Sequence, residues 1–148
     1  MSADQDLIKL YSNRILALAA DIPHLGRLDH PDVTVKRRAP LCGSTVTIDL
    51  KMANGQVTDY AAEVKACALG QAAASVVGRN VIGRTEQDLL SARAALRRML
   101  KNDGPTPAAP FEELDVLRAA KDFNNRHDSI LLTLDALAQA FDDIRASA

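Results

Sequence analysis

Strict alternation of apolar and polar positions marks residues 45–52. The even-numbered positions are apolar and the odd-numbered positions are threonine, aspartate or lysine, which is typical of a β-strand with one buried face. Asn54-Gly55 supplies the positive φ angles of a tight turn, so we expect residues 56–66 to return as a second strand. The β-branched start and charged end of residues 33–38 predict a short edge strand. We therefore expect three antiparallel strands whose charged face meets water.

Helical periodicity covers the other segments. Residues 4–20 carry an apolar stripe, residues 67–78 are a run of small residues, and a threonine cap before residue 86 predicts a helix to about residue 100. Residues 102–110, rich in proline, predict a surface loop. A short helix should follow over 111–120, and a last helix should begin after 123–128 and reach about residue 145. The expected buried positions are Leu7, Ile8, Tyr11, Ile15 and Leu18, then Leu89, Ala92, Leu96, Met99 and Leu100, and finally Ile130, Leu134, Leu137 and Phe141. This order predicts an α+β fold, a three-stranded antiparallel sheet with helices packed mainly on one face.

The composition is that of one small globular unit. With 148 residues, 47% of them hydrophobic, the chain can bury a core, and we expect a single domain over residues 1–148. Lys and Arg number 18 against 19 Asp and Glu, so the chain lacks the excess of basic residues that is typical of nucleic-acid-binding proteins. No apolar run approaches the roughly 20 residues that span a bilayer, and the acidic N-terminus does not resemble a secretory signal. We expect a cytoplasmic protein that binds neither nucleic acid nor membrane.

The two cysteines are the strongest candidates for chemistry. Cys42 follows Pro40 and precedes Gly43 just ahead of the first hairpin strand, and Cys67 stands where the returning strand gives way to a helix. In a cytoplasmic chain, two cysteines are more often reduced thiols or ligands than a structural bridge. The free N–H groups of a helix start favour the thiolate at Cys67, the form that binds iron or zinc and accepts sulfur. The alternative is that both cysteines are small buried hydrophobic residues.

The segments around the cysteines resemble one family of proteins. Four stretches, Leu10-Tyr11, residues 40–43 (PLCG), residues 66–75 (ACALGQAAAS) and Ile82-Gly83, are similar to the IscU/SufU/NifU scaffold family. Residues 126–137 resemble the segment that carries the third cysteine of that family. The resemblance covers most of the chain in the same order. It implies the fold expected above and a role in the assembly or transfer of iron–sulfur clusters.

The resemblance also implies a ligand set, of which this chain keeps only a part. Cys42 matches the first cysteine of the family and Cys67 the second, while Ser44 stands at the aspartate position. Ser129 stands at the third cysteine position, and Asp128 stands where IscU-like members have histidine. We expect an iron–sulfur cluster at Cys42, Cys67 and Ser129, and an iron or zinc ion at Cys42, Cys67 and Asp128. Because neutral serine is a poor ligand for either metal, binding should be weak.

Other interpretations of these positions remain open from the sequence. Asp128 and Ser129 could cap the final helix, and His127 could either complete the metal site or be a solvated residue. We expect both cysteines to face a common hollow at one end of the sheet, unbridged, with the start of the last helix beside them. Coordinates that separate these segments would refute the site.

The function implied is that of a scaffold without turnover chemistry. In the family, a cysteine desulfurase delivers sulfur and recipient apo-proteins take up the cluster. The alternatives are an interaction or regulatory module that kept the fold but holds no cluster, and a sulfur carrier that uses Cys42 as a persulfide acceptor. A hydrolase with a Cys/His pair is formally allowed, but nothing near either cysteine resembles one.

Overall fold

The sheet has three antiparallel strands, as the alternation predicts. A computed structural model of the protein describes residues 11–41 and 43–147. The strands are β1 Val33–Arg38, β2 Thr45–Ala53 and β3 Gln56–Lys65, in the order β1-β2-β3, so the first strand lies at an edge. Asn54 and Gly55 form the turn with φ angles of 54° and 77°. The predicted hairpin is therefore confirmed.

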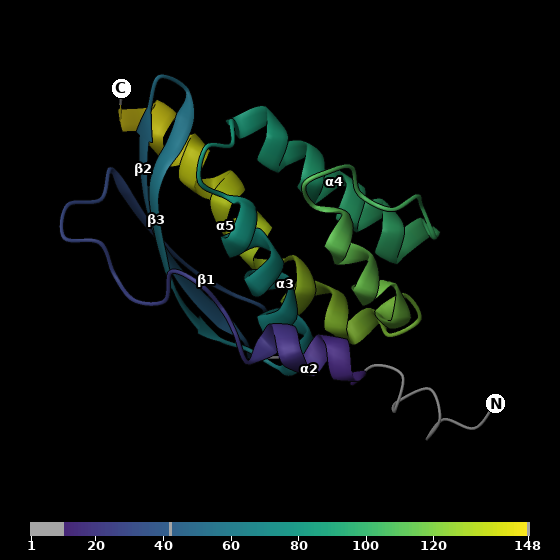
Figure 1. Ribbon diagram of the computed structural model, residues 1–148. Coiled ribbons are helices and arrows are strands. Elements are labelled where there is room, and N and C mark those ends of the chain that lie inside the picture. Colours follow the sequence, from purple (N-terminus) through teal and green to yellow (C-terminus); the bar gives the residue numbers. More distant parts are fainter. Residues whose placement is uncertain (1–10, 42, 148) are drawn as a thin grey trace.

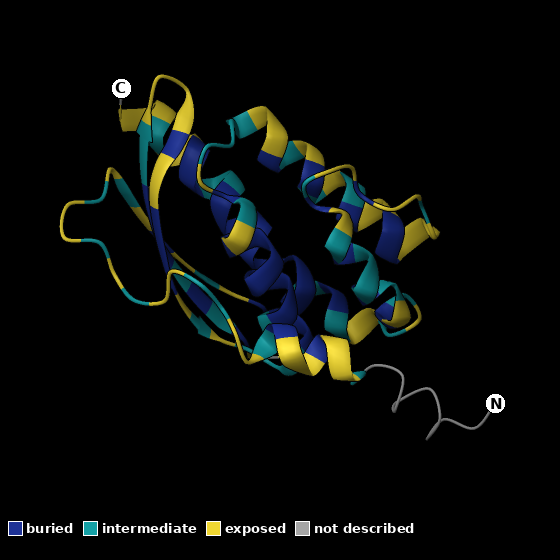
Figure 2. Ribbon diagram, viewed as in Figure 1, coloured by how far each residue is buried: buried dark blue, intermediate teal, exposed yellow. Residues whose placement is uncertain are grey.

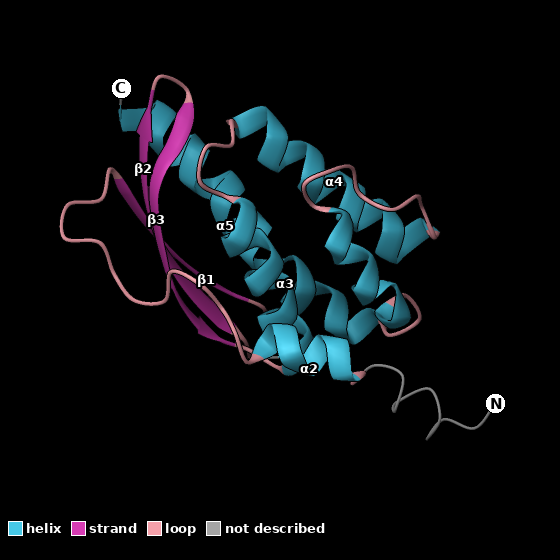
Figure 3. Ribbon diagram, viewed as in Figure 1, coloured by secondary structure: helices cyan, strands magenta, loops and turns pink. Residues whose placement is uncertain are grey.

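Helices cover one face of the sheet in two layers (Figures 1 and 3). α5 (Asn124–Ser147) packs against β1 and β2, and α3 (Ala68–Asn80) packs against β3 and α5. α4 (Glu86–Asn102) and the 3₁₀ helix η1 (Glu112–Ala120) pack on α5 from outside, while α2 (Asn13–Ala19) packs on α3. The expected α+β arrangement, with helices mainly on one face, is confirmed.

The buried residues gather between the sheet and the inner helices (Figure 2). Val46, Ile48 and Leu50 of β2 are each at most 1% exposed, so the face predicted to be apolar is the buried one. On the helix side, the stripes predicted for α4 and α5 are buried in full. Among residues 11–41 and 43–147, none of the helices has the length and apolar character needed to cross a membrane.

Two helix starts and one helix type differ from the prediction. Ser12 caps the N-terminus of α2 by accepting a hydrogen bond from Ile15 N, so the helix begins at Asn13 and does not run unbroken through residues 11 and 12. The expected Leu7 and Ile8 lie outside the described residues. Residues 112–120 are a 3₁₀ helix rather than an α-helix, and α5 begins at Asn124, earlier than expected.

The outer face of the sheet is not simply solvated. Asp49 points to the face predicted to meet water, yet it is fully buried. The segment before β1 crosses that face, and Asp49 accepts hydrogen bonds from Arg27 Nε (2.7 Å), Leu28 N (2.9 Å) and Thr34 Oγ1 (2.6 Å). The burial of Asp49 raises its pKa, but these donors outweigh burial and hold the pKa below its usual value. The prediction fails here because a loop, which has no periodic signature, covers the strand.

Candidate functional site

The candidate site lies where the segment before β2 meets the segment after β3. Thr45 pairs with Lys65 at the end of the β2–β3 ladder. Ser44 immediately precedes that pair on one strand, and Cys67 follows it two residues later on the other. In an antiparallel hairpin the start of one strand lies beside the end of its neighbour, so the two segments meet at one end of the sheet.

The loop that carries Cys42 is closed by its own backbone. Ala39 N donates to Ser44 O (2.8 Å), and Gly43 N donates back to Ala39 O (2.9 Å). Gly43 has a φ of +69°, which a residue with a side chain rarely adopts, so the tight turn here depends on glycine. Leu41 is 70% exposed at the tip. Cys42 itself lies outside the described residues, and its position beside Cys67 stays a prediction.

Ser129 links the strand end to the helix end through its hydroxyl. Its Oγ lies 2.9 Å from Ser44 Oγ and 3.6 Å from Cys67 Sγ, both within hydrogen-bonding reach. Ser44 and Ser129 are buried at 4% and 2% exposure, and Cys67 is half-buried. The resemblance assigns these positions to the aspartate (Ser44), the third cysteine (Ser129) and the second cysteine (Cys67) of the family. They converge from the residue before β2, from α5 and from the residue before α3.

A glycine in α3 makes this convergence possible. A Cβ on Gly70 would lie 2.6 Å from Ser129 Oγ, 2.9 Å from Ala66 Cβ and 3.0 Å from the Ser129 carbonyl oxygen. Since real Cβ atoms do not approach so closely, any side chain at position 70 would push α5 away from the start of α3. Gly70 thus sets the distance between Cys67 and Ser129.

The surroundings of Cys67 favour its thiolate form. Burial acts to raise the pKa of the Cys67 thiol, but the backbone amide of Gly70, the Ser129 hydroxyl, the backbone amide of Leu69 and the charge of Arg126 together lower it below its usual value. Cys67 is the N-cap residue of α3, next to the N–H groups that the start of a helix leaves without partners in the helix. It is a free thiol, and a thiolate is the form that coordinates metal or attacks sulfur.

The start of α5 settles two of the alternatives left open by the sequence. Because α5 begins at Asn124, Asp128 and Ser129 lie in its second turn, and the prediction that they cap the helix is wrong. His127 is fully buried and not solvated; its Nε2 donates to Ala120 O (2.9 Å). Residues two apart on an α-helix point about 200° apart, so His127 turns toward η1 while Ser129 turns toward Cys67.

Asp128 lies between these two directions and is half-buried. Within the part of the chain that the structure describes, no group of three His, Cys, Asp or Glu side chains could hold a metal ion. Cys42 is not among these residues. The role of Asp128 as a ligand stays a prediction.

Sequence reasoning missed two residues of this site. Gly70 was one of several small residues in α3, and only the position of α5 shows why it must be glycine. Arg126, whose charge favours the Cys67 thiolate, precedes Ser129 by three residues. That spacing, which puts both on one helix face, is a signal the sequence does contain.

Comparisons with known proteins agree with this geometry. The family model described as the NifU-like N terminal domain matches residues 10–140. The chain is similar to the crystal structure of a NifU-like protein (N-terminal) from Brucella abortus, with 46% sequence identity, a TM-score of 0.93, and coverage of 97% of this chain and 99% of that one.

Two further proteins are similar to this chain at lower sequence identity. One is a putative iron–sulfur cluster assembly scaffold protein for the SUF system from Fervidobacterium islandicum AW-1, at 20% identity and a TM-score of 0.79 over 90% of this chain and 97% of that one. The other is the iron–sulfur cluster assembly scaffold protein IscU of Thermotoga maritima, 24% identical over 135 residues, which are 91% of this chain and 94% of that protein. Together with the match over residues 10–140, these similarities show that the chain belongs to the NifU-like N-terminal domain family, the IscU/SufU/NifU group that its cysteine segments resemble.

Proposed function

We propose that this protein is an iron–sulfur cluster assembly scaffold that holds its cargo at the end of the sheet where Cys67, Ser129 and the loop of Cys42 meet. The observation that carries the proposal is the 3.6 Å contact between Cys67 Sγ and Ser129 Oγ. It brings the second and third ligand positions of the family together, next to Ser44. The cluster or iron is the cargo of the scaffold, and the protein itself performs no turnover chemistry.

The residues present fit such a cargo only in part. The Cys67 thiolate is a good ligand for iron or zinc, and Cys42 would supply a second one. The hydroxyls of Ser44 and Ser129 are neutral and are already hydrogen-bonded to each other, so they compensate poorly for the water that a metal loses on binding. Asp128 is the candidate for a charged third ligand. We therefore propose weak, readily released binding.

The remaining parts of the proposal concern the setting of the scaffold. The whole chain would act as one domain in the cytoplasm, receive sulfur from a cysteine desulfurase and pass clusters to recipient apo-proteins. The thiolate-favouring surroundings of Cys67 support this assignment because sulfur transfer and cluster ligation both require the deprotonated thiol.

Anaerobic purification followed by iron, zinc and sulfide analysis tests the proposal. Iron together with acid-labile sulfide, lost on treatment with a chelator, is the expected result. Protein reconstituted with iron and sulfide that never retains either would contradict it and would favour an interaction module without cargo. A persulfide in the absence of metal would favour a sulfur carrier.

A cysteine at position 129 should strengthen binding. Two thiolates on one tetrahedral metal with bonds of about 2.3 Å lie about 3.8 Å apart, close to the 3.6 Å between Cys67 Sγ and Ser129 Oγ. Ser129→Cys should raise the retained metal, Cys67→Ser should abolish retention, and Ser91→Cys, an exposed serine on α4, is the matched control. Equal retention by Ser129→Cys and Ser91→Cys would refute a ligand role for position 129.

A further inference from the structure

A cavity of about 400 Å³ lies between α4 and the segment 105–111. None of the residues that build the Cys67 site lines it. Its walls combine small and apolar side chains, among them the buried ring of Phe111, with five polar ones: Arg84, Asp88, Ser91, Arg98 and Thr106. The alanines that line it are Ala92, Ala95, Ala108 and Ala109. Cavities of this size that combine apolar walls with a few polar groups are typical of small-molecule sites.

The polar groups of the cavity are unevenly charged. Arg84 and Arg98 line it with a single carboxylate, that of Asp88. Asp88 Oδ2 accepts a hydrogen bond from Thr85 N (3.0 Å) in the capping box of α4, so the helix N-terminus already compensates its charge. In the part of the chain that the structure describes, the Arg98 guanidinium makes no hydrogen bond or ion pair. The cavity therefore carries an excess of positive charge.

Arg84 has a donor that the protein leaves unused. Its Nε is buried and has no hydrogen-bond partner among the described residues. Burying an N–H donor without an acceptor is unfavourable, and native proteins rarely leave one so. Arg84 also lines the cavity, and its guanidinium group matches a carboxylate in shape and charge.

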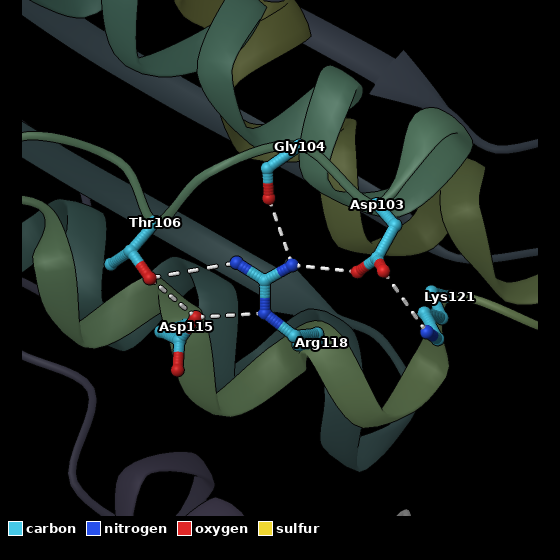
Figure 4. Close-up of polar contacts among 6 residues, drawn as sticks. All are labelled: Asp103, Gly104, Thr106, Asp115, Arg118 and Lys121. Atoms are coloured by element: carbon cyan, nitrogen blue, oxygen red, sulfur yellow. Dashed lines mark hydrogen bonds and ion pairs between the residues drawn. The ribbon is translucent and has the colours of Figure 1, made fainter.

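The backbone around the cavity is fixed before any ligand arrives. On one side, Arg84 O accepts from Val57 N (2.9 Å), which ties the residue to the start of β3. On the other side, Arg118 donates to Asp103 Oδ1 and Gly104 O (both 2.8 Å) and to Asp115 Oδ1 (3.0 Å), which holds the loop after α4 in place (Figure 4). A site held in this way loses little conformational freedom on binding.

We propose that this cavity binds a small organic carboxylate with an apolar body. The carboxylate pairs with the Arg84 guanidinium, and the apolar body lies against the alanine-lined wall of α4. The site is separate from the proposed cluster site, and its test does not depend on metal or sulfide.

Titration of ¹⁵N-labelled protein, followed by two-dimensional NMR, tests the proposal. The probes are 3-phenylpropanoate, 4-methylpentanoate and indole-3-acetate, each compared with its uncharged amide at up to about 10 mM, above the roughly millimolar affinity expected of such small ligands. At least one carboxylate should shift the backbone amides of Arg84, Ala95 and Phe111 saturably. Its amide should bind roughly tenfold more weakly, because it cannot form the charged pair.

Variants separate this site from general surface binding. Arg84→Gln should weaken the carboxylate roughly tenfold, and Ala95→Leu should fill the cavity and remove binding of all probes. Arg97→Gln, an exposed arginine of α4 that does not line the cavity, should leave binding unchanged. The proposal is overturned by the absence of saturable shifts with all three carboxylates, by equal binding of the amides, or by an equal effect of Arg84→Gln and Arg97→Gln.

Discussion

Replacing Gly70 with alanine is the sharpest test of the contact between α3 and α5. Helix propensity alone would make this change stabilising by about 0.5–1 kcal/mol. The added Cβ, however, would meet Ser129 Oγ at 2.6 Å, Ala66 Cβ at 2.9 Å and the Ser129 carbonyl oxygen at 3.0 Å. The last two atoms cannot rotate out of the way, so the helices must separate.

The net effect should be a clear loss of stability. Overpacking a close contact costs about 1–3 kcal/mol, and three simultaneous contacts place Gly70→Ala near the upper end. After the propensity gain is subtracted, about 2 kcal/mol of destabilisation remains, a fall in Tm of about 4–8 °C for a chain of this size. Thermal unfolding followed by circular dichroism measures it.

Gly70→Ala should also make the thiolate form of Cys67 less favourable. As α5 moves away, Cys67 loses the Ser129 hydroxyl and the nearby charge of Arg126, both of which lower its pKa, so the pKa should rise. The rate of alkylation by iodoacetamide as a function of pH measures this in a Cys42→Ser background, where only one thiol reacts.

Gly78→Ala in the same helix is the matched control. Its added Cβ would meet Pro23 Cγ at 3.1 Å and the Pro23 carbonyl oxygen at 3.4 Å, so a shift of a few tenths of an ångström suffices, and Tm should change little. If Gly70→Ala changes Tm as little as Gly78→Ala does and leaves the pKa of Cys67 unchanged, then the close approach of the two helices at this point is refuted.

Three further changes test other parts of the structure. Ser129→Ala should raise the pKa of Cys67 by removing a hydroxyl donor, and an unchanged alkylation profile would show that the hydroxyl does not reach the sulfur. Burial lowers the pKa of His127 despite its hydrogen bond to a backbone carbonyl. The unfolded chain therefore binds more protons than the folded one, and the free energy of unfolding should decrease as the pH falls from about 7.5 to 5.5. In urea titrations at these two pH values, His127→Gln should reduce the difference in the free energy of unfolding. An unaltered difference would show that other groups cause the pH dependence. Arg118→Ala removes the donors that hold the loop after α4 and should lower the free energy of unfolding by about 1–2 kcal/mol. Arg97→Ala, at an exposed position, should change it by no more than about 0.5 kcal/mol. Equal urea midpoints for the two variants would contradict this prediction.

Local patterns were enough to predict most of the elements of the fold. The alternation of residues 45–52, the Asn54-Gly55 turn and the capping box of α4 each involve positions within a few residues of one another. Hydrophobic periodicity and turn preferences depend on residues that are close in sequence, so they can be recognised in a single sequence. The position of Cys67 at the start of α3 followed from the same local signals.

The burial of particular polar residues depended on tertiary structure. Asp49 is covered by a loop some 21 residues earlier in the chain, and His127 is enclosed by η1. The loop over Asp49 has no period that the sequence could reveal, and although a helix over 111–120 was predicted, its packing against His127 was not. Asp49 was expected to be solvated, and His127 was expected either to be solvated or to complete the metal site. Their burial is tolerated because each finds hydrogen-bond partners in the segment that covers it.

The sequence by itself determined the strands, the hairpin and the helix start that carries a thiol. Only the tertiary structure decided that Ser44, Cys67 and Ser129 share hydrogen bonds, since the contacts span 85 and 62 residues of the chain. The distance between them is set by Gly70, whose lack of a side chain has meaning only once α5 lies across it. Helical period fixes which face a residue occupies, but packing between helices fixes how closely two faces approach, and that approach brings Ser129 within reach of Cys67.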